Sequence, residues 1–295
     1  MIRYAITEAE LRQKINAQRA DWQTRAIAAT SFFQRAGKYG ERKDKNWDTQ
    51  KYGVPPTPFW GQIKLVYMRL QKHKCAFCER RLSVRTRDHD VEHFRPKRAV
   101  EAWPPYPADT AFPEGYYLLA YHPLNYATAC DHCNRGLKRS WFPVAAARLS
   151  SQTEPQHLAP ERPLLIYPIG DIDTYPETLL GFHGIAPGSK NRGLTPHEHA
   201  RAQVTIEFFE LDVREELLRE RSEVIESLHS ALKWEKDTPE PGQRQRLQQM
   251  ITRTQSAGSR HASCARCFVA LFQQDPHEAE RLVEIAIRYL DSAVI

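Results

Sequence analysis

The stretch DVEHFRPKRAV, residues 90–100, sets an acidic residue, Glu92, directly before a histidine, His93. Three cations follow around a proline: Arg95, Lys97 and Arg98. An acid–histidine pair by itself is common on ordinary protein surfaces, where it carries no special role. The meaning of this pair therefore depends on which other residues the fold brings beside it.

The bulk composition is that of a folded protein. The chain has 295 residues, of which 41% are hydrophobic and 26% charged, enough for one large or two small packed domains. No apolar stretch approaches the roughly 18–20 residues that cross a bilayer, and the polar start MIRYAITEAE lacks a signal-peptide core. We therefore expect a cytoplasmic protein with no membrane association. A net charge of +6 permits a nucleic-acid partner without requiring one.

All six cysteines fall in CxxC pairs: Cys75 with Cys78, Cys130 with Cys133, and Cys264 with Cys267. In a reducing compartment, such pairs favour metal binding over disulfides. The first two pairs supply four thiolates, the usual set for a closed tetrahedral structural zinc site. The 51 residues between them (130 − 78 − 1) contain Glu92 and His93. The third pair has no evident fourth ligand, although His261 lies at helical spacing, and we expect two core cysteines there.

The N-terminal half has helical periodicity and then a short irregular module. A capping box at Thr7–Glu10 precedes apolar residues that recur from Leu11 to Phe33, which predicts one long amphipathic helix. A second helix around Phe59–Gln71 leads to Cys75. Short strands and proline-rich loops are expected from there to the second CxxC pair.

The C-terminal half is predicted to be mostly helical. The apolar run LLIYP, residues 164–168, suggests a strand, and Thr195–Glu198 is a second capping box before a helix. A further helix follows Asp212 and stops at TPEPG, residues 238–242, and a final helix begins at Asp275. The fold class is therefore expected to be α+β, mainly α.

Two asparagines complete a recognisable arrangement. Asn125 lies five residues before Cys130, and Asn134 directly follows Cys133. Over about residues 75–143, this order of CxxC, acid–histidine, asparagine and CxxC-Asn resembles the HNH endonucleases. A tighter resemblance, reaching about Leu228, is to the HNH subunits of Septu and retron-linked antiphage systems, the PtuB type. It is carried by KCAFCERRL, VEHFRPK, CNRGLKRSWFP, RPLLIYP and RAQVTIEFFELDVREELLRER.

The resemblance implies a three-part chain and a function. A zinc-stapled ββα-metal module at residues 61–145 would be embedded in a helical scaffold, formed by an N-terminal helical segment at 1–60 and a mainly helical region at 146–295. The implied function is a metal-dependent nuclease that hydrolyses phosphodiester bonds. It would be the effector of an antiphage system and would work with an ABC-type ATPase.

The resemblance also implies roles for single residues. His93 would be the general base, Asn125 would brace its imidazole by a hydrogen bond, and Glu92 and Asn134 would hold a catalytic Mg²⁺ or Mn²⁺. The nucleic-acid backbone would be held by five cations: Arg95, Lys97, Arg135, Lys138 and Arg139. The chain departs from the family at two positions, because Asn134 stands where many relatives have histidine and Lys138 lies one residue later than in some relatives.

Three points stay open at the level of sequence. The chain can be a non-catalytic zinc-binding adaptor that docks a partner, although an adaptor has no need for all four of Glu92, His93, Asn125 and Asn134. The basic cluster can be an ordinary solvated face. The substrate can be DNA or RNA, because a module that reads the phosphate backbone leaves the choice of base to its surroundings.

Overall fold

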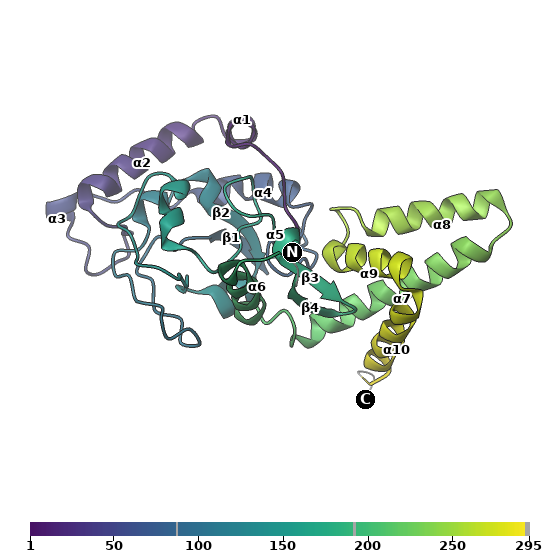
Figure 1. Ribbon diagram of the computed structural model, residues 1–295. Coiled ribbons are helices and arrows are strands. Elements are labelled where there is room, and N and C mark those ends of the chain that lie inside the picture. The colour runs from purple at the N-terminus through teal and green to yellow at the C-terminus, as the bar shows by residue number, and fades with distance from the viewer. Residues whose placement is uncertain (87, 191–192, 293–295) are drawn as a thin grey trace. The chain divides into compact units, whose positions relative to one another are not determined.

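The computed structural model describes residues 1–86, 88–190 and 193–292, and it is α+β and mainly helical (Figure 1). Its strands form two two-stranded sheets, β1–β2 and β3–β4. The expected fold class is thus confirmed. Within the described residues, no helix is long and apolar enough to span a membrane.

The chain forms two compact units that do not follow chain order. Arg3–His73 and Leu82–Thr174 make up one, here called the β1–β2 unit. Met1–Ile2, Lys74–Arg81 and Tyr175–Ile295 make up the other, the helical unit. The three segments predicted from the sequence, 1–60, 61–145 and 146–295, describe chain organisation and stay a prediction.

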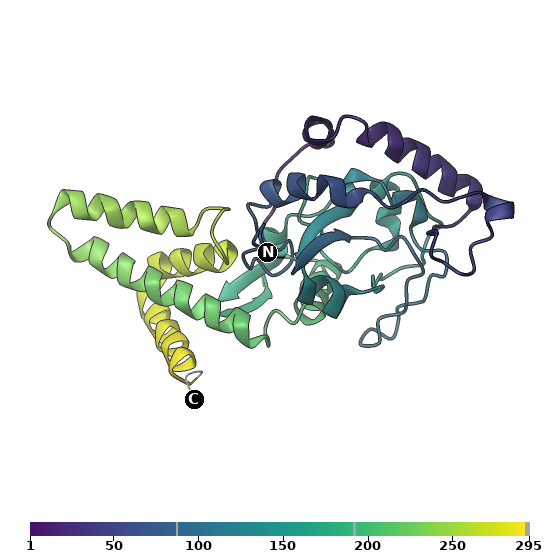
Figure 2. The same ribbon diagram turned by 180° about the vertical axis from the view of Figure 1, so that it is seen from behind.

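The β1–β2 unit combines one hairpin with short helices. Its α-helices and strands are α1 Glu8–Gln18, α2 Trp22–Ala36, α3 Thr49–Tyr52, α4 Lys64–Leu70, β1 His89–His93 and β2 Tyr126–Cys130. Its other helical turns are η1 Trp60–Ile63, η2 Tyr117–Leu119, η3 Pro123–Asn125, η4 His132–Lys138 and η5 Pro155–Glu161. Figure 2 shows α4 beside the hairpin. Gln71, directly after α4, bonds both backbone groups of Thr128 in β2, at 2.8 and 2.7 Å.

The predicted long N-terminal helix is two helices. The capping box at Thr7 and Glu10 starts α1 as expected, but the backbone turns extended at Arg19 (φ −154°) and a new helix begins at Trp22. The turn lets Trp22 pack on the hairpin, with its ring 6.3 Å from that of Tyr126. Periodicity misses this break because the apolar spacing continues through it and no proline or glycine marks it.

The hairpin that carries the acid–histidine pair is short and largely buried. β1 pairs antiparallel with β2, from His89 opposite Cys130 to His93 opposite Tyr126. The helix that follows, η4, is a π-helix, in which the N–H of Arg139 donates to the carbonyl of Asn134 five residues earlier, at 2.9 Å. The chain order of two strands and a helix matches the expected order of elements.

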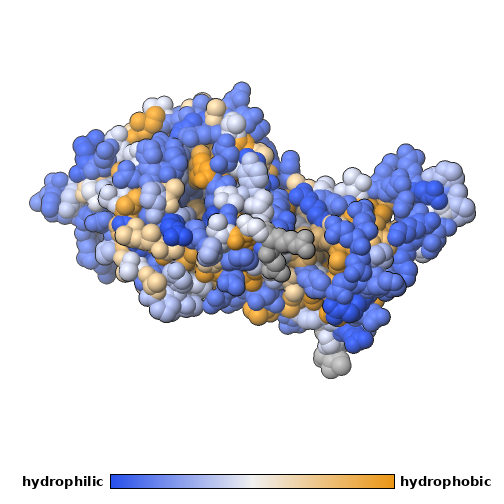
Figure 3. All heavy atoms as spheres, in the orientation of Figure 1, coloured by the Kyte–Doolittle hydropathy of each residue, from blue (hydrophilic) through white to orange (hydrophobic). Residues whose placement is uncertain are grey.

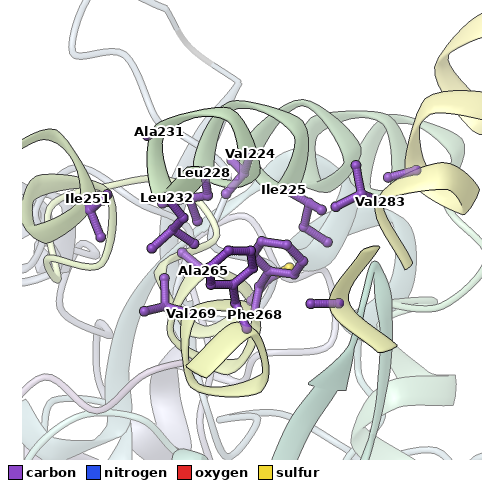
Figure 4. Close-up of a cluster of buried hydrophobic side chains, with 14 residues drawn as sticks. Val224, Ile225, Leu228, Ala231, Leu232, Ile251, Ala265, Phe268, Val269 and Val283 are labelled. Carbon is purple, nitrogen blue, oxygen red and sulfur yellow. The ribbon is translucent and has the colours of Figure 1, made fainter. Parts of the chain in front are cut away.

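The described part of the helical unit contains the second hairpin and six α-helices. They are α5 Pro176–Leu179, β3 Leu180–His183, β4 Ala186–Ser189, α6 Pro196–Phe208, α7 Glu215–Asp237, α8 Pro241–Thr254, α9 Ala262–Gln274 and α10 Pro276–Ser292. Its core lies where α7, α9 and α10 meet, and Figure 4 shows Ile225 and Leu228 of α7 facing Phe268 of α9. In the view of Figure 3, hydrophilic residues cover α8.

In this half one prediction is wrong, and two features were not predicted. LLIYP is not a strand but a buried irregular segment, with isolated bridges at Pro163 and Ile169 on either side of it. The β3–β4 hairpin was not expected. TPEPG does end α7, but it also starts α8, because Pro241 occupies the first turn and the Glu240 side chain caps it. Proline is therefore a start signal here as well as a stop.

Candidate functional site

The two faces of β1 contact different elements. Alternate residues of a strand point to opposite sides. Glu92 and Asp90 face η4, where they pair with Lys138 at 2.7 Å and Arg135 at 3.7 Å. His93 lies against η1 on the other side, with its ring 4.7 Å from that of Trp60. Glu92 and His93 are adjacent in sequence, but their side chains therefore contact different elements: Glu92 contacts η4 and His93 contacts η1.

Glu92 is a buried carboxylate, 7% exposed, with a buried cation against it. The Lys138 ammonium lies 2.7 Å from Oε1, as an ion pair rather than a well-aligned hydrogen bond. Burial raises the pKa of Glu92, and the positive charges of Lys138 and Lys97 oppose that rise. The site around this carboxylate is therefore one that already accommodates positive charge.

His93 is oriented by a backbone carbonyl. Its Nε2 lies 3.1 Å from the Ala120 oxygen, and Tyr126 donates its hydroxyl to the same oxygen. A carbonyl can only accept, so Nε2 carries the proton and Nδ1 is the unprotonated nitrogen. Nδ1 has no protein partner among the described residues. Burial holds the pKa of His93 well below its usual value, and the charge of Lys97 lowers it further.

The predicted hydrogen bond from Asn125 to the imidazole is wrong. The Asn125 amide nitrogen donates to the carbonyls of Arg95 and Leu119, at 3.0 and 3.1 Å, and its oxygen accepts from the Arg95 N–H at 2.8 Å. Asn125 thus ties the backbone after β1 to the turn that presents Ala120. It positions His93 through that turn, because a buried amide is best satisfied by nearby backbone groups.

Asn134 is half-buried on η4, directly after Cys133. Among the described residues its side-chain amide has no hydrogen-bond partner. A π-helix turns once in slightly more than four residues, so Asn134 and Lys138 lie on the same face. Because Lys138 contacts Glu92, that face is turned toward β1. Asn134 therefore offers a carbonyl oxygen on the side of η4 that faces the Glu92 carboxylate.

The five predicted backbone-holding cations have different surroundings. Arg95 is buried, paired with Glu161, and stacked on the rings of Tyr116 and Phe142 at 4.9 and 4.7 Å. Lys138 is fully buried against Glu92. Exposed positions are held by Arg135 and Arg139, and a half-buried one by Lys97. A phosphate contact from Arg95 or Lys138 requires breaking a buried ion pair. Arg135 is exposed and forms only loose surface ion pairs with Asp90 and Asp131, at 3.7 and 3.6 Å. Among the described residues, Arg139 and Lys97 lie within ion-pair distance of no carboxylate.

The four cysteines of the first two CxxC pairs come together. The sulfur atoms of Cys75, Cys78, Cys130 and Cys133 all lie within 4.8 Å of one another, and none forms a disulfide. Four sulfurs around zinc at about 2.3 Å are separated by roughly 4 Å, so the donor set fits a tetrahedral structural zinc ion. The predicted ligand set is therefore able to hold zinc.

The third CxxC pair lies on α9 of the helical unit and is not part of the four-cysteine cluster. Cys264 is buried, donates its thiol to the Gly184 carbonyl at 3.4 Å, and has its pKa raised to about 12, mainly by burial. Cys267 is half-buried one turn later. Cys264 is thus a core residue as expected, while Cys267 is only partly so.

Sequence reasoning missed two residues that contact His93 but lie far from it in the chain. Trp60 packs its ring edge-on to His93 and lies under the Lys97 ammonium at 4.5 Å. Ala120 supplies the carbonyl that fixes the tautomer. A tryptophan next to a predicted helix start was the only signal for Trp60, and a backbone carbonyl leaves no signal in a sequence.

Comparison with curated proteins finds a partial relative, Septu protein PtuB of Bacillus mycoides (strain KBAB4). The two are 34% identical over 82 residues, which is 28% of this chain and 26% of the relative. The chain thus aligns with about a quarter of the length of that protein. No family model matches the chain, and no solved structure gives a significant match. The similarity supports a relationship to Septu-type proteins over the aligned part.

Proposed function

We propose that this chain is a metal-dependent nuclease of the HNH type that hydrolyses phosphodiester bonds in nucleic acid. The observation that carries the proposal is the state of His93. Its Nε2–H donates a hydrogen bond to the Ala120 carbonyl, and its Nδ1 has no protein partner among the described residues. Burial lowers the pKa of the imidazole. Such an imidazole is neutral at physiological pH and can accept a proton from water.

Glu92 and Asn134 fit a divalent ion. Both supply hard oxygen ligands, which Mg²⁺ and Mn²⁺ prefer, and two protein ligands leave positions for water and phosphate. The Glu92 carboxylate already has a cation 2.7 Å away, and η4 turns Asn134 toward it. A metal ion there supplies charge neutralisation for the phosphate and for the leaving 3′ oxygen. Lys138 must then share the carboxylate or move from it.

The accessible cations complete the site. Arg135 and Arg139 on η4 and Lys97 after β1 are available to phosphate oxygens, and these contacts hold a strand without selecting its sequence. DNA and RNA both present this backbone. The four cysteines hold structural zinc at the end of β2, where η4 begins, and so keep the Asn134 side of the site in place.

The test is cleavage by purified protein with Mg²⁺, with Mn²⁺ and with neither, against duplex DNA, single strands and structured RNA. The variant His93→Gln retains a side-chain N–H but no base, so we expect at least a hundredfold loss of cleavage rate with unchanged thermal stability. His157→Gln, at an exposed histidine of the same unit, is the matched control and should cleave normally. Wild-type activity in His93→Gln would refute the assignment.

The same assay separates the nuclease from the adaptor alternative, which predicts zinc binding and no cleavage on any substrate. The similarity to Septu protein PtuB supports the further proposal that the chain acts in antiphage defence. We also propose, from the resemblance of its sequence motifs, that it works there with an ABC-type ATPase. We expect a stable complex formed mainly by helices outside residues 75–143. Co-expression followed by size-exclusion chromatography tests it, and separate elution with full, unregulated activity would exclude the partner.

A further inference from the structure

We propose that a strip of aromatic rings carrying lysines without carboxylate partners leads a nucleic-acid backbone to His93. The strip consists of Tyr39, Trp47, Tyr52 and Trp60, with Lys38, Lys51 and Lys97 on its rings. All seven residues belong to the β1–β2 unit. The inference rests on the proposed nuclease function and adds to it the surface that binds the substrate.

The strip is continuous with the candidate site. Ring centroids connect His93 to Tyr52 in five steps of 4.7, 6.4, 4.8, 6.5 and 5.3 Å, from His93 to Trp60, Tyr39, Phe33, Trp47 and Tyr52. Because each step is a direct ring contact, the aromatic side chains form one packed support. A charge held on that support has a defined position relative to the reacting histidine.

The lysines are held by ring faces instead of by acids. The Lys38 ammonium lies 4.6 Å from the Tyr52 ring centroid and 5.4 Å from that of Trp47. Lys51 lies 5.0 Å from Tyr52, and Lys97 lies 4.5 Å from Trp60. Cation–π contact holds an ammonium group without neutralising it. In the described part of the chain none of the three lies within ion-pair distance of a carboxylate, so no direct ion pair competes with a phosphate for these ammonium groups.

Two neighbouring cations, Arg98 and Lys43, are instead paired with carboxylates. Arg98 also lies over Tyr39, at 5.2 Å, but its guanidinium is paired with Asp44 at 2.9 Å and Glu41 at 3.2 Å. Lys43 is 80% exposed and pairs with Glu41. Had the whole region been an ordinary solvated face, the strip lysines would be expected to find such partners too. Tyr39 and Trp47 are buried, so these rings position the lysines, and the lysine charges are what would bind a nucleic-acid backbone independently of sequence.

The salt dependence of binding tests the strip. In the His93→Gln background, which prevents cleavage, binding of a labelled 20-nucleotide single strand and of its duplex is measured between 50 and 200 mM salt. Each lost phosphate contact lowers the slope of log K against log salt by about 0.7–0.9. Lys38→Gln with Lys51→Gln should therefore lower it by about 1.4–1.8 and weaken binding on the order of tenfold per lysine at 50 mM salt.

The matched control is Lys14→Gln with Lys72→Gln, which removes the same charge at exposed positions of the same unit. It should leave the slope unchanged. An equal loss in both pairs means that only net charge matters, and no loss in the strip variant means that the strip is not used; either result overturns the proposal. Whether the single strand or the duplex loses more identifies the form that the strip binds.

Hydrolysis of bis(p-nitrophenyl) phosphate by the wild type with Mn²⁺ keeps the two proposals apart. This diester is too small to reach from His93 to Tyr52, so it reports on the catalytic site alone. Hydrolysis together with an unchanged salt slope defeats the strip and leaves the nuclease. A lysine-dependent slope without hydrolysis of any diester supports the strip and defeats the nuclease.

Discussion

Burial shifts the pKa values of three ionisable side chains near the candidate site: Lys97, Glu92 and His93. Burial disfavours the charged form of each group. It lowers the pKa of Lys97 to about 8, although Glu92 and Glu41 oppose this, and it lowers that of His93 while raising that of Glu92. In each case burial shifts the pKa in the direction that favours the uncharged form of the side chain.

Lys97 makes nucleic-acid binding depend on pH. Its ammonium is charged below about pH 8 and neutral above it, so a phosphate contact made at pH 7 is lost as the pH rises through 8. We expect affinity to fall between pH 7 and 9, and the salt slope to fall by about 0.7–0.9. Fluorescence anisotropy at both pH values measures this. Lys97→Arg stays charged and should bind equally at both; a wild type without pH dependence would contradict the assignment.

At the scale of elements, η4 carries three of the candidate site residues in one short helix. It begins just after Cys130, carries Cys133 and Asn134 in its first turn, and returns Lys138 to Glu92 on β1. Residues four apart share a face of this helix, as they do in an α-helix, so Asn134 and Lys138 lie on the same side of η4. This arrangement brings Lys138 to the Glu92 carboxylate at 2.7 Å.

Lys138→Met should therefore destabilise the protein. It leaves the Glu92 carboxylate buried without its cation, which costs about 3 kcal/mol of unfolding free energy. Mn²⁺ should then raise the melting temperature more than it does in the wild type, because the ion takes the place of the ammonium. The measurement is thermal unfolding with and without Mn²⁺.

Two variants control this experiment. Arg135→Met removes an exposed charge from the same helix and should change the melting temperature little. Glu92→Gln combined with Lys138→Met removes both charges and should recover most of the lost stability while abolishing the Mn²⁺ effect. A Mn²⁺ effect that persists in the double variant would place the ion away from Glu92.

At the scale of the whole molecule, the chain brings distant segments together at the four cysteines. Two segments separated by 51 residues (130 − 78 − 1) supply the sulfurs, which lie within 4.8 Å of one another. Closing so long a loop is entropically costly, and zinc binding at the four sulfurs would offset that cost as folding energy. The β1 strand with Glu92 and His93 lies inside the closed loop.

Cys133→Ser should therefore lose zinc and stability together. We expect one zinc ion per wild-type chain and less than 0.2 in the variant by elemental analysis, with a lower urea midpoint. The control is Cys267→Ser, which changes a half-buried cysteine outside the cluster and should keep its zinc. Full zinc content in Cys133→Ser would mean that the four sulfurs are not the ligand set.

Features set by near neighbours could be predicted from the sequence. The capping boxes at Thr7 and Thr195 form as expected, because each depends on a residue three positions away. Two CxxC pairs supply the four thiolates of a structural zinc site, which predicted that they lie together. Their sulfur atoms do lie close to one another. The mainly helical α+β class followed from periodicity in the same way. The roles of His93 and Asn134 in catalysis stay predictions.

Tertiary structure decided what each side chain contacts across the chain. The Asn125 amide bonds backbone instead of the imidazole, and Arg95 turns inward to Glu161, 66 residues away. The fold also buries Lys138 against Glu92 and sets Trp60 beside His93. Sequence determines which groups are present and how the nearest ones interact. Burial and the pairing of charges that are distant in sequence depend on how the whole chain packs. These two factors determine which cations are accessible to a phosphate group.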